Sequence, residues 1–393
     1  MRERVTFVHG PEVQIDPSAL RLRPGLVAGP LAEVVRQDRL TLTLDELPPP
    51  PPSSSSSSSS GLAAFLRRVG AVHLRWTSAE RHDDALEPFC SRLPPGLWVS
   101  LTPLTGEWLP SLGSRELCGF LRASFGPVDC MEPEAFTVSD TGGRLSLSFY
   151  QLIDNLDALS AWAERQFCTD TACHDRLKSF NAVSLDISFD STDQLLRVAA
   201  SGPLKEQKLT VAASENRRTE VGFLTKHEPP NIGPFEIGLG GFLAVLGEDR
   251  QPSPTLFAFP SRHRLSGASF SSRFLSPTGL HPTLQLNLST DALPAEAKAG
   301  DVECKPYAYL TLPKAVFADR YQLQDEFLLA SKNLAALRHS TLPVDLEAPA
   351  YATQTWGSSI LLELAPPPPP PPGTSRTGGG SRGLLSFRFM RGT

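Results

Sequence analysis

Val183-Ser184-Leu185-Asp186-Ile187-Ser188-Phe189-Asp190 is the stretch that decides the fold class. Its apolar residues alternate strictly with serine and aspartate, a pattern typical of a strand with one face in a core and the other in water. Ser191-Thr192-Asp193 has the composition of a turn, and Leu195 to Ala200 can return as the partner strand. The stretch therefore predicts a β-hairpin.

Three other segments show the same alternation of apolar and polar side chains and predict further strands. They are Leu40 to Leu44, Val72 to Trp76 and Leu145 to Phe149. Beyond Cys173 the pattern consists almost entirely of strands and of turn signals such as Gly238 to Gly241. We therefore expect strands to outnumber helices.

Helical spacing of apolar residues is found mainly in the first half of the chain. Leu152 to Phe167 carries the longest such pattern, and shorter helices are predicted over Ser114 to Phe125 and Leu62 to Val69. In the second half, one helix is expected within Gln324 to Arg338. There Asp325-Glu326 begins a run of good helix formers and places negative charge at the helix N-terminus.

These patterns predict an α+β, β-rich fold with two folded regions. Residues 1–175 form an N-terminal α+β region, and residues 180–364 form an antiparallel β-sandwich-like region. The proline and serine runs of residues 48–60 read as an extended, exposed insertion. Residues 365–393 are rich in proline, glycine and arginine, and we expect a disordered tail there.

Charge and hydropathy narrow the classes of partner. The chain has 37 Lys and Arg against 42 Asp and Glu, a net charge of -5, and no basic stripe, so we expect no nucleic acid partner. The first ten residues contain no apolar core of a signal peptide. No run of about 18 apolar residues occurs either. From the sequence as it stands we expect no cleavable leader and no transmembrane helix.

No motif of catalysis, of metal binding or of cofactor binding is recognisable. Asp186 and Asp190 are four positions apart on one strand, which separates their carboxylates by about 13 Å, farther than a glycosidase pair. Gly238 to Gly241 lacks the spacing of a phosphate-binding loop, and no nucleophile elbow is present. We therefore expect no catalytic residue, no metal and no cofactor, and a protein that is not an enzyme.

Two features concern covalent modification. Cys168 and Cys173 are spaced so that they can close a small disulfide loop, while six buried thiols in a reducing compartment are the alternative, and the sequence leaves both open. Asn287-Leu288-Ser289 is the one N-glycosylation sequon. Asn287 lies on the polar face of a strand whose leucines face the other way, so we expect Asn287 to accept a glycan if the chain enters the secretory pathway.

The second half of the chain contains a series of distinctive short phrases. They are Thr278-Gly279-Leu280-His281-Pro282-Thr283, Tyr307-Ala308-Tyr309-Leu310-Thr311-Leu312-Pro313, Asp319-Arg320-Tyr321-Gln322-Leu323 and Trp356-Gly357-Ser358. The order and spacing of these phrases resemble the PIG-X family, whose fungal members are the "protease B nonderepressible" proteins. The resemblance extends over roughly residues 1–364, and many ordered motifs are more specific than any single one.

The resemblance implies a non-catalytic, stabilising subunit of GPI mannosyltransferase I. Such a subunit has a lumenal domain in the endoplasmic reticulum and one C-terminal transmembrane helix. It binds a PIG-M-type catalytic mannosyltransferase, which adds the first α-1,4-linked mannose to the GPI precursor. It is also linked to the folding and stability of other proteins of the endoplasmic reticulum. Tyr309 and Trp356 are then candidates for the interface, although the core is an equally good place for each.

The chain departs from the family pattern after Leu364, where the Pro/Gly/Arg tail stands in place of further lumenal sequence and the membrane span. We expect this to reflect a truncated gene model or a soluble variant. Three other functions stay open on sequence grounds: a general lumenal chaperone or folding factor, a hydrolase with a cryptic active site, and a fragment without function. A chaperone predicts several clients, and a hydrolase predicts converging polar groups in a pocket.

Overall fold

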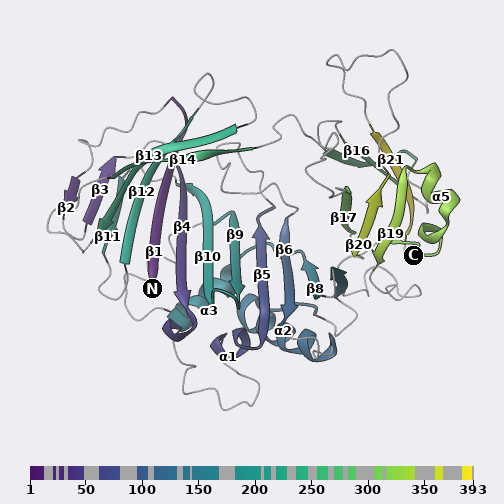
Figure 1. Ribbon diagram of the computed structural model, residues 1–393, viewed down its shortest axis with the longest axis horizontal. Helices are drawn as coiled ribbons and strands as arrows, with labels where there is room; N and C mark the ends of the chain where they lie inside the picture. Colours follow the sequence, from purple (N-terminus) through teal and green to yellow (C-terminus); the bar gives the residue numbers. More distant parts are fainter. Residues whose placement is uncertain are drawn as a thin grey trace. The chain divides into compact units, whose positions relative to one another are not determined.

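A computed structural model gives the structure of the chain (Figure 1). It describes residues 1–12, 21–23, 26–30, 34–47, 62–79, 95–104, 110–130, 136–141, 144–167, 182–204, 208–213, 218–227, 236–246, 255–263, 270–277, 282–288, 305–312, 316–340, 359–365 and 383–391. The chain divides into two compact units. The first comprises Met1–Val128 and Asp140–His263, and the second comprises Asp129–Ser139 and Arg264–Thr393.

The first unit is built on an 11-stranded mixed sheet. In hydrogen-bonding order its strands are β14 (Thr255–His263), β13 (Glu236–Leu246), β12 (Arg218–Lys226), β1 (Arg2–His9), β4 (Val34–Thr43), β10 (Leu195–Leu204), β9 (Ser184–Asp190), β5 (Val69–Thr77), β6 (Gly96–Pro103), β8 (Arg144–Gln151) and β7 (Thr137–Thr141). A separate three-stranded sheet has the order β11 (Lys208–Ala212), β3 (Leu26–Pro30) and β2 (Arg21–Arg23).

The predicted hairpin is confirmed as β9 and β10, which pair antiparallel from Leu195 opposite Asp190. Leu185 and Phe189 are buried, as the alternation requires, while Asp190 is exposed at the turn. The hairpin lies in the middle of the sheet, with β4 on one side and β5 on the other. The alternating pattern of residues 183–190 therefore describes a central strand of the first unit.

Among the described residues of this unit, the sheet is accompanied by α1 (Leu62–Leu66), α2 (Pro110–Phe125), α3 (Asp157–Phe167) and the 3-10 turn η2 (Leu44–Glu46). Phe120 of α2 joins the three helices, because its ring stacks on Phe65 of α1 at 5.2 Å and meets Trp162 of α3 edge-on at 5.9 Å. Two of these helices are shorter than predicted and one is longer. α1 ends before Val69, which begins β5, and α2 begins before Ser114. α3 begins only at Asp157, and Ile153 before it accepts a hydrogen bond from the Trp76 indole.

The middle of the sheet contains a pairing between strands far apart in the sequence. β1 pairs in parallel with β12, and Phe7 lies opposite Phe223, with ring centroids 5.5 Å apart. Both side chains are buried, and they belong to a core with Val5 and Val221. The backbones are close here: a Cβ added at Gly241 of β13 would lie 1.9 Å from the carbonyl oxygen of Phe223. Glycine is therefore required at position 241.

The second unit consists of two small antiparallel sheets. The first has the order β15 (Phe270–Phe274), β16 (Thr283–Leu288), β21 (Gly383–Arg391) and β18 (Val316–Ala318), and the second has the order β17 (Tyr307–Thr311), β20 (Ser359–Leu364) and β19 (Leu334–Ser340). Leu284 and Leu286 of β16 share one core with Ile360 and Leu362 of β20. The two sheets therefore pack through their apolar faces.

The predicted α+β, β-rich fold class is confirmed, but two of its boundaries change. The division near residues 175–180 is wrong because β9, β10, β12, β13 and β14 complete the sheet of the first unit, which extends to His263. In the tail of residues 365–393, for which we expected disorder, Gly383–Arg391 forms β21. Leu385, Phe387 and Phe389 alternate there and supply the strand pattern. The Pro/Ser insertion at 48–60 lies outside the described residues.

The helix expected within Gln324 to Arg338 is a short one. It comprises η5 (Gln322–Gln324) and α5 (Glu326–Ser331), and the Asp325 side chain caps α5 by accepting hydrogen bonds from the backbone of Phe327 and Leu328. Asn333 ends the helical region with a φ of 56°, a left-handed conformation that asparagine tolerates. The end of the predicted range, from Leu334 on, belongs to β19.

Candidate functional site

One face of the large sheet presents polar and charged side chains across several strands. Cross-strand pairing places Arg75 of β5 opposite Asp186 of β9, and His73 of β5 opposite Ser188. The Asp186 carboxylate lies 2.9 Å from His73 Nε2 and 3.1 Å from Arg75 Nε. Burial on its own raises the pKa of Asp186, but the hydrogen bond and charge of His73, together with Arg75, outweigh it and lower that pKa.

A second ion cluster lies on the same face, centred on the carboxylate of Glu220. The Glu220 side chain is only 1% exposed and receives Arg2 through two hydrogen bonds of 2.8 and 2.9 Å. Arg4 donates to it at 2.8 Å, and Arg218 at 3.1 Å. Burial on its own raises the pKa of Glu220. The hydrogen bonds and charges of Arg2 and Arg4 outweigh burial, so the pKa is lowered overall. One buried negative charge is thus shared by three arginines.

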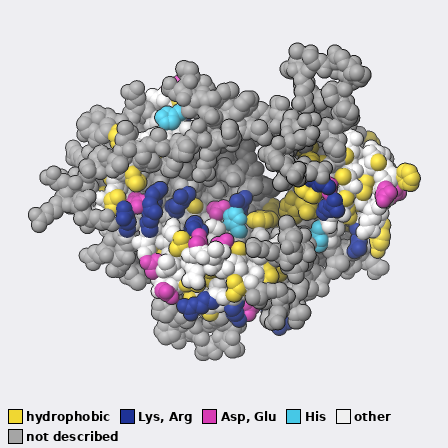
Figure 2. Space-filling model, viewed as in Figure 1, with side chains coloured by type: hydrophobic (Ala, Val, Ile, Leu, Met, Phe, Trp, Pro, Cys, Tyr) yellow, Lys and Arg dark blue, Asp and Glu magenta, His cyan; other side chains and the backbone are white. Residues whose placement is uncertain are grey.

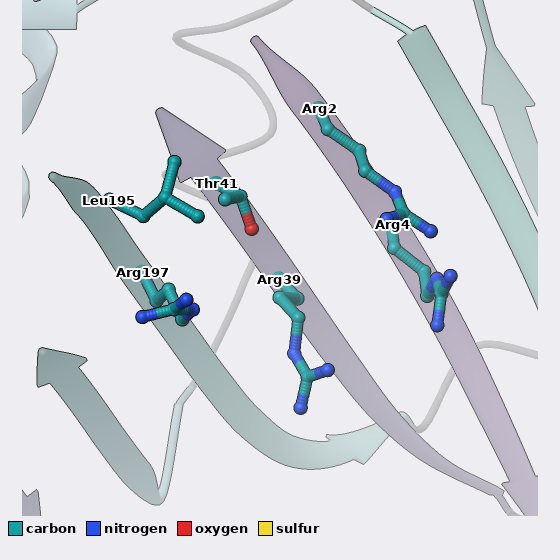
Figure 3. A pocket seen from close by; sticks show the side chains of 6 residues that line it. All are labelled: Arg2, Arg4, Arg39, Thr41, Leu195 and Arg197. Atoms are coloured by element: carbon teal, nitrogen blue, oxygen red, sulfur yellow. The ribbon is translucent and has the colours of Figure 1, made fainter. Parts of the chain in front are cut away.

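Between these two clusters the surface is hollowed, with a volume of about 270 Å³ (Figure 3). Its lining comes from three neighbouring strands: Arg2 and Arg4 from β1, Arg39 and Thr41 from β4, and Leu195 and Arg197 from β10. Figure 2 shows Lys and Arg side chains gathered in a band on this side of the molecule, with a few acidic side chains between them. The hollow is therefore a strongly cationic part of the surface.

A different kind of surface lies on the second unit, on the outer face of the β17–β20–β19 sheet. Tyr307 and Tyr309 of the edge strand β17 are 49% and 38% exposed. They lie opposite Glu363 and Leu361 of β20. Glu363 forms ion pairs with Arg338 of β19 and with Lys305, at 3.6 Å for the latter. Tyrosines beside arginine are a composition typical of protein interfaces.

Two further aromatic side chains of the second unit are strongly exposed. Tyr321 is 77% exposed, and Phe327 at the start of α5 is 89% exposed. Arg320 lies over the Tyr321 ring at 5.6 Å from its centroid. Single exposed apolar side chains are common on folded proteins, so the exposure of these two residues makes them available for contact without defining a site.

The residues predicted from the sequence are not brought together in one site. Asn287 lies on β16, partly exposed, and its side-chain amide donates to Ser271 Oγ at 3.2 Å. Asp190 accepts from the Thr192 backbone at 2.7 Å and closes the hairpin turn. Tyr309 is on the surface, as its role as an interface candidate requires. Trp356 and the candidate pair Cys168 and Cys173 lie outside the described residues.

The structure contains a disulfide that the sequence did not reveal. Cys118 of α2 and Cys130, which follows the helix, are disulfide-bonded and fully buried. The bond ties the C-terminal half of α2 to the segment after it. Spacing alone does not identify this pair, because six cysteines allow 15 pairings.

The described residues offer neither a metal site nor a membrane-spanning helix. No group of three or more His, Cys, Asp and Glu side chains is placed to hold a metal ion in the part of the chain that the structure describes. None of the helices in those same segments combines the length and the apolar character that crossing a bilayer requires.

We predict that Asn287 carries a glycan when the protein is expressed in fungal cells. The amide is partly exposed on a strand, so a transferase can reach it before the strand pairs, and a glycan there points away from Leu284 and Leu286. Endoglycosidase H should increase the electrophoretic mobility of the parent protein and leave Asn287→Gln unchanged. Equal mobility of the untreated parent and the variant would refute this modification.

Comparison with known proteins gives one family and several relatives. A family model described as PIG-X / PBN1 matches residues 277–380, within the second unit. Protein PBN1 of Gibberella zeae is 48% identical over 373 residues, covering 93% of this chain and 71% of the relative. Protein pbn1 of Neurospora crassa is 41% identical over 374 residues, and that of Emericella nidulans is 35% identical over 386 residues, both with the same coverage.

Proposed function

The chain belongs to the PIG-X / PBN1 family, and on that premise we propose that it is a non-catalytic stabilising subunit of GPI mannosyltransferase I. The observation that carries the proposal is the 48% identity over 93% of the chain with a PBN1 protein. The family supports a role related to GPI-anchor biosynthesis. The finer role is the addition of the first α-1,4-mannose by a PIG-M-type catalytic partner, to which this chain contributes stability and no reacting group.

The outer face of the β17–β20–β19 sheet is the surface that we assign to this partner. It lies within residues 277–380, which match the family model, and it combines exposed tyrosines with an Arg338–Glu363 ion pair. A subunit that binds only the folded transferase raises the free energy of unfolding of the transferase. The gain grows with the logarithm of the ratio of the subunit concentration to the dissociation constant. Tyr307 and Tyr309 supply rigid aromatic area at the centre of such a contact.

We further propose that both units work in the lumen of the endoplasmic reticulum. One observation supports the lumenal location. The buried disulfide between Cys118 and Cys130 persists in an oxidising compartment, whereas the cytosol would keep these thiols reduced.

A second candidate function is that of a folding factor with several clients in the endoplasmic reticulum. The strong exposure of Tyr321 and Phe327 favours it, because a chaperone presents apolar side chains that no single partner covers permanently. The two functions differ in what is bound. A dedicated subunit co-purifies with one transferase in a fixed ratio, while a folding factor co-purifies with many unfinished chains.

The dedicated role is tested with the double variant Tyr307→Ser, Tyr309→Ser. Loss of two interface tyrosines is expected to weaken binding at least about tenfold and to lower the cellular level of the transferase with it. The measurement is co-immunoprecipitation of the tagged transferase, quantified against the parent protein. Phe270→Ser is the matched control, because Phe270 is 73% exposed on β15 and lies outside residues 277–380.

The control variant should retain the transferase at the parent level. Undiminished co-purification by the double tyrosine variant would exclude this face as the contact. If the transferase is retained by neither the parent nor any variant, while many other chains are, the folding-factor function replaces the subunit function.

A further inference from the structure

The cationic hollow on the first unit is not used by the proposed subunit contact, which lies on the second unit. The hollow is lined by Arg2, Arg4, Arg39 and Arg197, together with Thr41 and Leu195 (Figure 3). Of the described residues that line it, none is a carboxylate. Four guanidinium groups on three adjacent strands therefore face one space with no lining acid to neutralise them.

Most of these arginines have counter-ions at the edge of the hollow, but the charges do not balance. Arg2 and Arg4 share the single carboxylate of Glu220 with Arg218. Arg197 forms an ion pair with Asp193. The Glu220 side chain is 1% exposed, so its charge is not presented to the solvent. The surface of the hollow therefore keeps a net positive charge.

Among the described residues, Arg39 has no ion-pair partner. It lies directly opposite Arg4 in the register of β1 and β4, and it makes no ion pair or hydrogen bond with any described residue. Like charges directly opposite each other on a sheet are destabilising. Partial burial, followed by the charges of Arg4, Arg2 and Arg197, lowers the pKa of Arg39, and Asp186 opposes this only in part. A bound anion would relieve this repulsion.

We propose that the hollow is a binding site for a phosphate ester, with Arg39 donating to the phosphate from its centre and Arg4 and Arg197 flanking it. Guanidinium groups match a phosphate with paired, charge-assisted hydrogen bonds, and several of them together favour phosphate over a single carboxylate. Thr41 adds a hydroxyl donor from the same strand as Arg39. A volume of about 270 Å³ accommodates a phosphate with a small polar group.

The first test uses glycerol 3-phosphate and the purified full chain. Calorimetric titration in low salt should give saturable binding, and the ligand should raise the Tm. Arg39→Gln should weaken this binding at least about tenfold, since a charge-assisted contact is lost. Without ligand, the Tm of Arg39→Gln should equal or exceed that of the parent, because a like-charge contact is removed. A merely structural arginine would show the reverse.

Arg75→Gln is the matched control. Arg75 lies on the same sheet face, 38% exposed, but it is paired with Asp186 and does not line the hollow. Its affinity for glycerol 3-phosphate should stay within about twofold of the parent value, because general charge on the face matters less than direct contact. Glutamate serves as a carboxylate probe and should bind far more weakly than glycerol 3-phosphate.

The source of the phosphate is separated by a flotation assay with phosphatidylcholine vesicles that contain or lack phosphatidic acid. Flotation that requires both phosphatidic acid and Arg39 identifies a lipid headgroup as the ligand. Binding of glycerol 3-phosphate that requires Arg39, without flotation, identifies a soluble phosphate ester. The proposal is overturned if neither probe binds, if Arg39→Gln binds as the parent does, or if glutamate binds as tightly as the phosphate. None of these results depends on the transferase, so the subunit function stands or fails separately.

Discussion

Phe223→Ala is expected to lower the free energy of unfolding of the first unit by about 4 kcal/mol. Phe223 is buried on β12, and its ring stacks on Phe7 at a centroid distance of 5.5 Å. The parallel pairing of β1 with β12 joins strands more than 200 positions apart in the chain, and a cavity between them removes packing from both. Urea unfolding followed by circular dichroism measures the change in the transition that belongs to this unit.

The matched control for this prediction is Leu104→Ala, because Leu104 belongs to the first unit and is 51% exposed. Its truncation should change the free energy of unfolding by less than about 0.5 kcal/mol. If both alanine variants shift the transition equally, the Phe7–Phe223 contact is not the core that the structure describes. In cells, the Phe223 variant should also be less abundant, because a larger fraction of the chain is unfolded and degraded.

Removal of the disulfide is expected to have the second largest effect on stability. The variant Cys118→Ala, Cys130→Ala should lose about 3 kcal/mol, the value for closing a loop of about 13 residues in the unfolded chain. Both side chains are buried, so alanine introduces no polar group into the core. Differential scanning fluorimetry, with and without a reducing agent, measures the difference in Tm between parent and variant.

Peptide mapping without reduction provides the direct check of this bond. It should recover the peptides of Cys118 and Cys130 linked to each other in protein purified from the secretory pathway. Complete alkylation of both thiols in the unreduced protein would contradict the disulfide and would weaken the support for a lumenal location. The pair Cys168 and Cys173 stays a prediction, and the same peptide map tests it.

The local elements of the fold could be predicted from the sequence because their signals are local. Residues 183–200 carry strict alternation around a turn, and they form the hairpin of β9 and β10. Leu117, Leu121 and Phe125 recur at helical spacing, and they are buried on α2. In both cases the side chains that decide the element are close together in the sequence, so their periodicity alone predicts it.

The long-range arrangement could not be predicted in this way. β1 pairs with β12, more than 200 positions away in the chain, and no residue of either strand specifies the other. The boundary of the first unit depends on this pairing, which is why the sequence placed it near residues 175–180 and the structure places it at His263. Strand partners are chosen by the packing of whole faces, and that information is spread over the unit.

The cationic hollow shows the same limit at the level of a site. Arg2, Arg4, Arg39 and Arg197 each occupy the polar position of an alternating strand, and that much is readable from the sequence. Their convergence depends on the register of β1, β4 and β10, which sets Arg39 opposite Arg4 and Arg197 opposite Thr41. The sequence signal for this site is the set of arginines at outward-facing positions of predicted strands. That signal does not say which strands are neighbours.

The most direct test of the subunit function is a lipid-labelling measurement. Cells depleted of this protein are fed tritiated inositol, and the GPI precursors are resolved by chromatography. The proposed function predicts accumulation of the acylated glucosaminyl phosphatidylinositol without mannose, and its disappearance when the protein is supplied again. A normal precursor profile in the depleted cells would contradict a role in the first mannosylation.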